Sequence, residues 1–255
     1  MTATAKDEWL AGVDGCPAGW IVAAVRPEGD EVRIAVVPRF ADVVAEARGI
    51  VAVDMPIGLP EVTPRKGRHA ESAARAVLGQ RRSSVFRIPS RAAVYASVAP
   101  TPADDRERYF LACKVARETS EDGKAFAKQG FYILDKVVEV DQLLCAQAGL
   151  SKRVRETHPE LAFWRLNGDR ALAEPKKVKS RCHEPGLALR RRLLIAAGLP
   201  ASVVEARPPK GAGPDDLIDA LACAAIARRL HAGLARPFPD PPPRDAYGLP
   251  MAIWA

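Results

Sequence analysis

The stretches Leu10-Ala-Gly-Val-Asp14-Gly and Ile50-Val-Ala-Val-Asp54-Met-Pro each place an aspartate at the end of a short apolar run. A run such as 50–53, which is apolar without alternation, is typical of a strand buried on both faces of a sheet. A carboxylate at the end of such a strand is costly unless it is hydrogen-bonded, paired or coordinated to a cation. The simplest explanation for both aspartates is that they bind the same divalent metal ion.

The residues around these two stretches predict an α/β fold with a mixed sheet. Residues 9–14, 19–25 and 31–37 have the pattern of three strands joined by turns, residues 40–48 that of a helix, and residues 50–53 that of a fourth strand. This order predicts an antiparallel meander, then a helix that crosses over to a strand parallel to an earlier one. Parallel neighbours end at the same edge of a sheet, so Asp14 and Asp54 would meet there if their strands are adjacent.

The length of 255 residues suits a single domain over 1–255 that carries an insertion. We expect residues 55–150 to be a largely helical insertion, with helices at 69–78, 102–119 and 131–148 and a loop at 80–91. A short strand at 152–157 and helices from His158, at 186–197 and at 215–232 follow. Residues 236–255 form a proline-rich arm, because 236–243 suits neither a helix nor a central strand. A closing edge strand is predicted at 246–254.

Composition narrows the class of protein. No apolar stretch approaches the roughly 18 residues of a membrane span, and residues 1–8 lack the apolar core of a secretory signal. We therefore expect a cytoplasmic protein with no membrane partner. The five cysteines are scattered without a C-x-x-C pair, which predicts reduced thiols and no zinc site. Cys16 lies beside Asp14, but without a histidine near it in sequence it is a weak candidate nucleophile.

The net charge of +7 is concentrated in one segment. Residues 64–91 hold eight Lys or Arg residues and one acid, Glu71, so this segment carries the whole imbalance. A concentrated basic stretch favours a phosphate-rich partner such as nucleic acid, although a solvated helix face would look the same. Phe86 is the one candidate for base stacking in this stretch. The candidate nucleic-acid-binding residues are Arg65, Lys66, Arg81, Arg82, Ser83, Ser84, Arg87, Lys176 and Lys177.

A third acidic cluster opens the apolar helix Asp215-Asp216-Leu-Ile-Asp219-Ala-Leu-Ala. Asp216 and Asp219 share a helix face, and Asp215 is the candidate N-cap. Capping and the helix dipole would by themselves explain acids at this position. The helix also has small residues that would allow it to pack closely on a sheet and turn an acid toward the strand ends: Ala220, Ala222, Ala224 and Ala225.

The segment Glu156-Thr-His158-Pro-Glu160 supplies a fourth set of polar candidates. Glu156 ends a short strand and is the better metal-ligand candidate, whereas Glu160 suits the first turn of a helix. His158 is either a solvated or a core histidine. It has no helical i, i+4 partner histidine, so a zinc site is not expected.

These motifs, taken in order, resemble those of a family of predicted RNase-H-like nucleases over about residues 10–233. The resemblance rests on Gly12-Val-Asp14-Gly-Cys-Pro-Ala-Gly-Trp20, Val53-Asp54-Met-Pro-Ile-Gly-Leu-Pro60, Gly79-Gln-Arg-Arg-Ser-Ser-Val-Phe86, Glu156-Thr-His-Pro-Glu160-Leu-Ala-Phe163 and Asp215-Asp216-Leu-Ile-Asp219-Ala. It implies an RNase-H-like mixed sheet flanked by helices, with the helical insertion after the fourth strand.

The last helix also resembles the closing helix of RuvC-type Holliday junction resolvases, in which D-x-x-D-A-L-A supplies metal ligands. Asp216 and Asp219 match those acids, and Asp14 and Asp54 would be the metal acids of the first and fourth strands. Glu156, followed by Lys176, Lys177 and Lys179, is similar to the resolvases' fifth strand and its downstream lysines. The insertion after Asp54 departs from resolvase architecture.

Together these observations predict a metal-dependent nuclease. Asp14, Asp54, Asp216 and Asp219 would hold one or two Mg²⁺ or Mn²⁺ ions, since hard divalent cations prefer carboxylate oxygens. Glu156 would be an outer ligand or would orient water. DNA and RNA are both open as substrates. Resolvase-like nucleases usually act as dimers, so a homodimer is open as well.

Two other functions fit the same residues. Actin-like and sugar-kinase-like ATPases also begin with an aspartate before a glycine-containing turn whose N–H groups contact nucleotide phosphates, as Asp14-Gly-Cys-Pro-Ala-Gly19 could. Pro17 counts against this, because it lacks an N–H. The third reading is a non-enzymatic adaptor for nucleic acid or protein, in which the acids only cap helices and strands.

Overall fold

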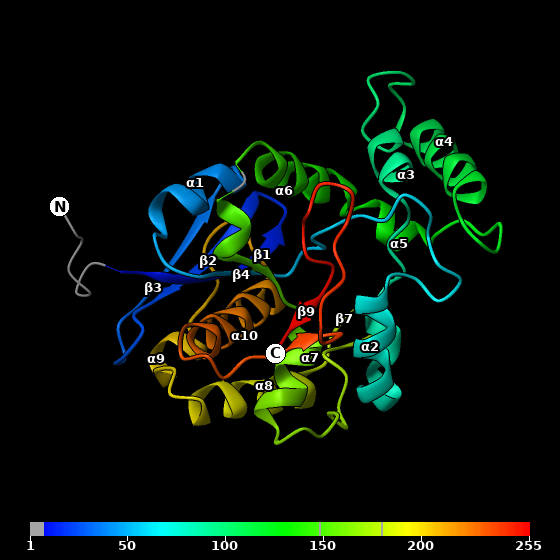
Figure 1. Ribbon diagram of the computed structural model, residues 1–255. Helices are drawn as coiled ribbons and strands as arrows, with labels where there is room; N and C mark the ends of the chain where they lie inside the picture. Colours follow the sequence, from blue (N-terminus) through cyan, green and yellow to red (C-terminus); the bar gives the residue numbers. More distant parts are fainter. Residues whose placement is uncertain (1–7, 148, 180) are drawn as a thin grey trace.

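A computed structural model describes residues 8–147, 149–179 and 181–255 (Figure 1). Residues 1–7, on which the secretory-signal expectation mostly rests, lie outside the described residues. So does residue 148, the predicted end of the 131–148 helix. The chain forms a mixed five-stranded sheet in the order β3-β2-β1-β4-β5. The strands are β1 (Leu10–Cys16), β2 (Gly19–Val25), β3 (Val32–Val37), β4 (Val51–Val53) and β5 (Val154–Glu156).

The pairing confirms the predicted crossover. Strands β1, β2 and β3 form an antiparallel meander, and helix α1 (Phe40–Glu46) leads to β4, which pairs parallel with β1. Strand β5 then pairs parallel with β4. The α/β class and the mixed sheet flanked by helices are therefore as expected. The carboxyl ends of β1, β4 and β5 share one edge of this sheet.

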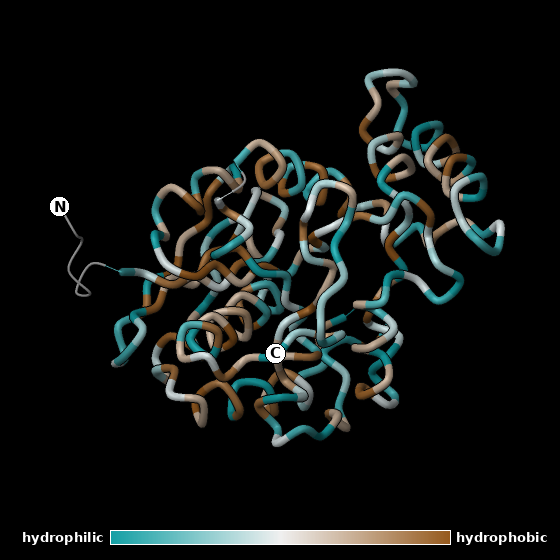
Figure 2. The backbone as a smooth tube through the Cα atoms, in the orientation of Figure 1, coloured by the Kyte–Doolittle hydropathy of each residue, from teal (hydrophilic) through white to brown (hydrophobic). Residues whose placement is uncertain are grey.

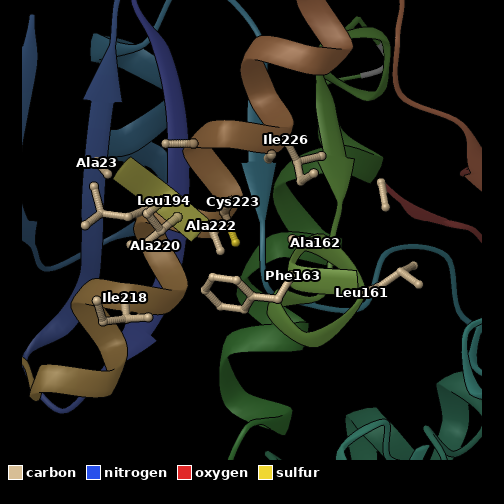
Figure 3. Packing of buried hydrophobic residues seen from close by; sticks show 14 of the residues in the cluster. Ala23, Leu161, Ala162, Phe163, Leu194, Ile218, Ala220, Ala222, Cys223 and Ile226 are labelled. Carbon is tan, nitrogen blue, oxygen red and sulfur yellow. The ribbon is translucent and has the colours of Figure 1, made fainter. Parts of the chain in front are cut away.

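Helices cover both faces of the sheet. Figure 1 shows α10 (Pro214–His231), α7 (Pro159–Leu166) and α8 (Glu184–Ala196) on one side, and α1 and α6 (Leu134–Ala146) on the other. Helix α10 packs directly on β1, because a Cβ atom at Gly12 would lie 1.9 Å from the backbone nitrogen of Ala224. Figure 3 shows Ala220, Ala222 and Cys223 beside Phe163 in this core. The expectation that small residues bring this helix close to the sheet is confirmed.

The segment between β4 and β5 is rich in helix. It holds α2 (His69–Val77), the 3-10 helix η2 (Gly79–Ser84), α3 (Arg91–Ala96), α4 (Asp105–Glu118), α5 (Lys128–Phe131), α6 and the 3-10 helix η3 (Leu150–Lys152). Helices α3 and α4 extend away from the sheet (Figure 1). The predicted loop at 80–91 is wrong over η2, where local hydrogen bonds such as Arg81 N to Leu78 O, 2.8 Å, close a tight turn.

The C-terminal part contains short strands and a turn. A hairpin of β6 (Lys177–Val178) and β7 (Arg181–Cys182) precedes α8, and α9 (Ala201–Val204) follows α8. Strands β8 (Pro237–Phe238) and β9 (Ile253–Trp254) form a separate antiparallel pair. The predicted edge strand at 246–254 is therefore wrong in extent and in partner. Its first half is a turn, in which Asp245 Oδ1 accepts hydrogen bonds from the backbone of Tyr247 and Leu249, both 2.9 Å.

The structure also bears on two expectations from the composition, the lack of a membrane span and the reduced cysteines. Apolar residues follow the strands and α10, which is buried all round over residues 217–227 (Figure 2). Among the helices that the structure describes, none is long and apolar enough to cross a membrane. All five cysteines are free thiols, as predicted.

Candidate metal centre

Three aspartates meet at the carboxyl edge of the sheet. Asp14 lies near the carboxyl end of β1, Asp54 directly follows β4, and Asp219 lies on the second turn of α10. Val13 pairs with Val53 in the parallel ladder, and Asp54 N donates to Val13 O at 2.9 Å, which sets the two strand-end acids side by side. One carboxylate oxygen from each aspartate lies within 4.8 Å of the others. Three elements far apart in the sequence thus place three potential ligands around one point.

The electrostatics of this cluster are unfavourable without a cation. Asp219 is 2% exposed, and its Oδ1 is buried with no hydrogen-bond partner among the described residues. Burial, followed by repulsion from Asp54 and Asp219, raises the pKa of Asp14 well above its usual range. Burial and Asp219 raise the pKa of Asp54 to about 7. Burial and the neighbouring carboxylates therefore disfavour the anionic forms of Asp14 and Asp54, and a bound cation would favour those forms.

Lys176 supplies part of the missing charge. Its ammonium group pairs with Asp219 Oδ2, although the sequence had suggested that Lys176 contacts phosphate. Burial opposes the charge on Lys176, but Asp219 and Asp14 outweigh it and raise its pKa. Lys177 lies outside this cluster, with its Nζ 2.5 Å from Asp215 Oδ2 at the start of α10. One lysine against three aspartates leaves a net negative charge.

Asp216 is not among the three clustered acids, although the sequence predicted it as a ligand. Its Oδ2 accepts a hydrogen bond from Gly213 N at 2.7 Å, so it caps the first turn of α10. The helix begins at Pro214 with Gly213 as its N-cap, and the prediction of Asp215 as N-cap is wrong. Asp216 is still near enough to contribute to the raised pKa of Asp14.

Glu156, the other predicted ligand, belongs to a separate buried cluster. Glu156 is in register with Val53, one residue before Asp54, and successive side chains on a strand point to opposite faces. Its Oε1 is 2.6 Å from Arg68 Nη2, and its Oε2 accepts from Ile57 N at 2.7 Å. Arg68 also binds Glu71, with Nε to Oε1 at 2.5 Å. Burial opposes the charge on Arg68, but the two glutamates raise its pKa.

His158 is half-buried and lines the cleft, and both of its ring nitrogens are engaged. Its Nδ1 accepts from Glu160 N at 3.1 Å, which fixes the proton on Nε2, and Nε2 lies 3.3 Å from Ser84 O. Burial lowers the pKa of the ring, which favours the neutral form. With both nitrogens engaged, the ring joins the start of α7 to η2. Glu160 is occupied as well, by Arg190 at 2.8 Å.

Asp14 and Asp54 of this cluster line a cleft of about 570 Å³. One wall comes from the sheet edge, and the facing wall comes from the helical segment between β4 and β5. Phe86, Tyr132 and Lys136 lie on that facing wall, and the Lys136 side chain packs over Gly15. The sequence had not indicated Tyr132 or Lys136, because no local pattern shows that the first turn of α6 lies beside the end of β1.

Half of the basic segment is used inside the protein. Arg68 pairs with glutamates, Arg75 donates to backbone carbonyls, Arg87 lies 2.8 Å from Asp122, and Arg91 binds Asp141 and Asp245. The sequence could not show these pairings, since most partners are distant in the chain. Within the described residues, no ion pair forms at Arg65, Lys66, Arg81 or Arg82. Ser84 lines the cleft, and Ser83 is exposed.

The turn after β1 offers little to a nucleotide phosphate. Gly15 N donates to Asp14 Oδ1 at 2.7 Å, and Ala18 N donates to Gly211 O at 3.2 Å. Pro17 has no N–H. Cys16 is buried, and burial raises the pKa of its thiol, which disfavours a nucleophilic role.

Comparison with known proteins gives one match. A family model described as "Protein of unknown function (DUF429)" matches residues 12–244, which include all three clustered aspartates. No curated protein and no solved structure gives a match. The description of the family names no activity, so the chemistry has to be argued from the site.

Proposed function

We propose that this chain, which belongs to the DUF429 family, is a divalent-metal-dependent hydrolase of RNase-H-like architecture that cleaves phosphodiester bonds of nucleic acid. One observation carries the proposal. Asp14, Asp54 and Asp219 converge within 4.8 Å, and the buried Oδ1 of Asp219 has no partner among the described residues. A buried carboxylate oxygen without a donor is costly, and a cation would satisfy it.

The donor set fits Mg²⁺ or Mn²⁺. All three groups are hard carboxylate oxygens, and sites of this kind commonly combine a few carboxylates with water and substrate phosphate oxygens. Asp14, Asp54 and Asp219 would hold the ion, while Lys176 orients Asp219 through its Oδ2. When bound, such an ion supplies Lewis-acid stabilisation of a phosphoryl oxygen and acidifies a water molecule. With Lys176 in place, the charge of the three aspartates balances one divalent ion.

The topology supports the RNase-H-like assignment. The assignment requires metal acids at the ends of the first and fourth strands and a further acid on the closing helix. Asp14, Asp54 and Asp219 occupy those positions on β1, on the residue after β4 and on α10. The inferred ligand set is smaller than the sequence suggested, because Asp216 caps the helix and Glu156 binds Arg68.

Nucleic acid is the substrate class that fits the charge. Arg65, Lys66, Arg81 and Arg82 remain without an acidic partner in the described residues, and Ser84 of the same segment lines the cleft. Cations without an acidic partner, in a segment that also lines the cleft, suit a backbone whose phosphates bring their own negative charge. These residues would therefore bind phosphates on either side of the scissile bond.

The proposal is tested by metal binding and cleavage measured together. Titration calorimetry should show Mn²⁺ binding that Asp14→Asn abolishes and that Asp215→Asn, a control acid paired with Lys177, retains. A labelled panel of single strand, duplex, RNA–DNA hybrid and four-way junction should then be cleaved in Mn²⁺ or Mg²⁺ by the parent protein and not by Asp14→Asn. Metal binding without cleavage would favour the adaptor reading. Thermal stabilisation by ATP without nucleic-acid binding would favour the nucleotide-binding reading.

A further inference from the structure

The two walls of the cleft contribute different groups. The sheet edge contributes Asp14 and Asp54, whereas the helical segment between β4 and β5 contributes the aromatic rings of Phe86 and Tyr132 together with charged side chains: Arg68, Glu71, Asp135 and Lys136. Tyr132 ends α5 and is 64% exposed, although it lines the same cleft as the acids. Phe86 follows η2 and is half-buried. An open ring and a fixed ring therefore lie on the wall that faces the candidate metal centre.

Tyr132 differs from the other strongly exposed tyrosine. Tyr247 is 62% exposed, but Arg91 stacks on its ring with the guanidinium carbon 4.2 Å from the centroid. Within the described residues, the ring contact of Tyr132 is an edge-on one with its neighbour Phe131, at 6.0 Å between centroids. No cation covers the Tyr132 ring in that part of the chain. Its face is free for a flat partner, and aromatic rings bind nucleobases by stacking.

Two lysines reach the cleft from different elements. Lys136 comes from the first turn of α6 and lies over Gly15, next to Asp14. Lys176 comes from the segment before β6 and pairs with Asp219. Both line the cleft together with Asp14 and Asp54. A phosphodiester at the aspartates would therefore lie within a frame that carries positive charge from two elements.

The size of the cleft limits what can enter. Its volume of about 570 Å³ lies within the range of small-ligand pockets, which suits one nucleotide. The bases of a duplex are stacked and paired, so none could reach Tyr132 without leaving the helix, and that costs energy. A single strand offers its bases without that cost.

We propose that the cleft accepts one unpaired nucleotide of a single strand, with its base against Tyr132 and Phe86 and its phosphodiester at the aspartates. The inference names the substrate form for the proposed function and rests on that function. Tyr132 is a specificity-determining contact, since it would distinguish an unpaired base from a paired one.

Binding is measured by fluorescence anisotropy with a labelled 12-nucleotide single strand, the matching duplex, and the same strand with abasic central positions. Ca²⁺ replaces Mn²⁺, and gel analysis afterwards checks that the strands are intact. The variants are Tyr132→Ala, Tyr132→Phe and the matched control Tyr247→Ala. Circular dichroism confirms that each variant is folded.

We expect the intact single strand to bind the parent protein and Tyr247→Ala equally, and Tyr132→Ala about tenfold more weakly, as is typical for loss of one stacking contact. Tyr132→Phe should bind like the parent, because stacking needs the ring and not the hydroxyl. The abasic strand should bind the parent more weakly than the intact strand does. Tyr132→Ala should distinguish the two strands less than the parent does, because only Phe86 still contacts the base. The duplex should bind more weakly than the single strand.

Equal binding of single strand and duplex would overturn the inference. So would a Tyr132→Ala variant that binds like Tyr247→Ala, or one that distinguishes the abasic strand as strongly as the parent does. If any of these results occurs while Asp14→Asn abolishes Mn²⁺ binding and cleavage, this inference fails and the proposed function stands. If Asp14→Asn changes neither, the proposed function fails.

Discussion

Two clusters of buried charge line the same cleft at the carboxyl edge of the sheet, and they are satisfied in opposite ways. In the arginine cluster, Arg68 binds Glu71, Glu156 and the carbonyl oxygens of Ile57 and Gly58, all within 3.1 Å. In the aspartate cluster, Asp14, Asp54 and Asp219 face one another with Lys176 as their paired cation. Each cluster combines an acid at the end of a strand with residues of a helix, and each holds more acids than cations.

The difference is between a cluster whose charges are satisfied within the protein and one that we propose as a binding site. The arginine cluster joins the start of α2 to β5 and to the segment after β4, so it fixes the helical wall of the cleft to the sheet. Its donors find acceptors within the protein. The aspartate cluster keeps one buried oxygen without a donor in the described residues, and burial together with neighbouring aspartates raises the pKa of Asp14 and of Asp54. An arrangement that is unfavourable alone and favourable with a ligand is typical of a binding site.

The largest effect should follow from breaking the arginine cluster. Arg68→Met leaves Glu71 and Glu156 buried without their cation, so the free energy of unfolding should fall by about 3–5 kcal/mol. Urea denaturation at pH 7 measures the loss. Arg87→Met, which removes a more exposed pair with Asp122, is the control and should lose much less. Adding Glu71→Gln and Glu156→Gln to Arg68→Met should recover part of the stability. Equal losses in the two single variants would show that the arginine cluster is not the stronger support.

The aspartate cluster should respond with the opposite sign. Asp54→Asn removes one of three repelling charges, so in EDTA at pH 8 the variant should unfold at a higher temperature than the parent. With Mn²⁺ at 100 times its Kd, the parent should gain about 2.7 kcal/mol, whereas Asp54→Asn should gain little. Thermal melts with and without Mn²⁺ measure both effects. A loss of stability for Asp54→Asn in EDTA, like the loss expected for Arg68→Met, would remove the distinction between the clusters.

The same cluster predicts a pH dependence of the metal-free protein. The pKa of Asp54 is about 7 in the folded state against 3.8 for an unperturbed aspartate, so the folded state binds more protons between these values. Stability should therefore decrease as the pH rises from about 4 to about 7, and Asp14, whose pKa is also raised, adds to the trend. Melts across this range in EDTA should show the decrease, and Asp54→Asn should reduce it. A flat profile for the parent would contradict the raised pKa of Asp54.

The sheet and the two strand-end acids could be predicted because their signals are local. Apolar runs that end in an aspartate, and a β-β-β-α-β order, are visible in the sequence, and the parallel ladder then places Asp14 beside Asp54. Asp219 was also found, because an acid on a helix of small residues indicates close packing on a sheet. The sequence analysis placed Glu156 with the aspartates, whereas its side chain points to the opposite face of the sheet from Asp54. That orientation follows from the register between β4 and β5, which neither strand shows alone.

The facing wall could not be predicted, because its contacts join distant parts of the chain. The composition of the basic segment favoured a phosphate-binding surface. In the structure, however, Arg87 pairs with Asp122, and Arg91 pairs with Asp141 and Asp245. Whether an arginine is free or paired depends on tertiary contacts that composition does not show. Tyr132 and Lys136 belong to helices whose sequence predicts only helix. Their position beside the aspartates follows from how α5 and α6 pack.

The smallest of these effects should come from Lys176, the one cation held inside the aspartate cluster among the described residues. Lys176→Gln removes a charge that competes with a metal ion for Asp219, so Mn²⁺ affinity should rise, by about tenfold or ~1.4 kcal/mol. Lys177→Gln is the matched control, since its partner Asp215 lies outside the cluster, and its Mn²⁺ affinity should stay close to that of the parent. Titration calorimetry measures both affinities and the number of ions bound. Weaker Mn²⁺ binding by Lys176→Gln would mean that Lys176 holds Asp219 in place for the ion more than it competes with it, and the aspartate cluster would then resemble the arginine cluster in needing its internal cation.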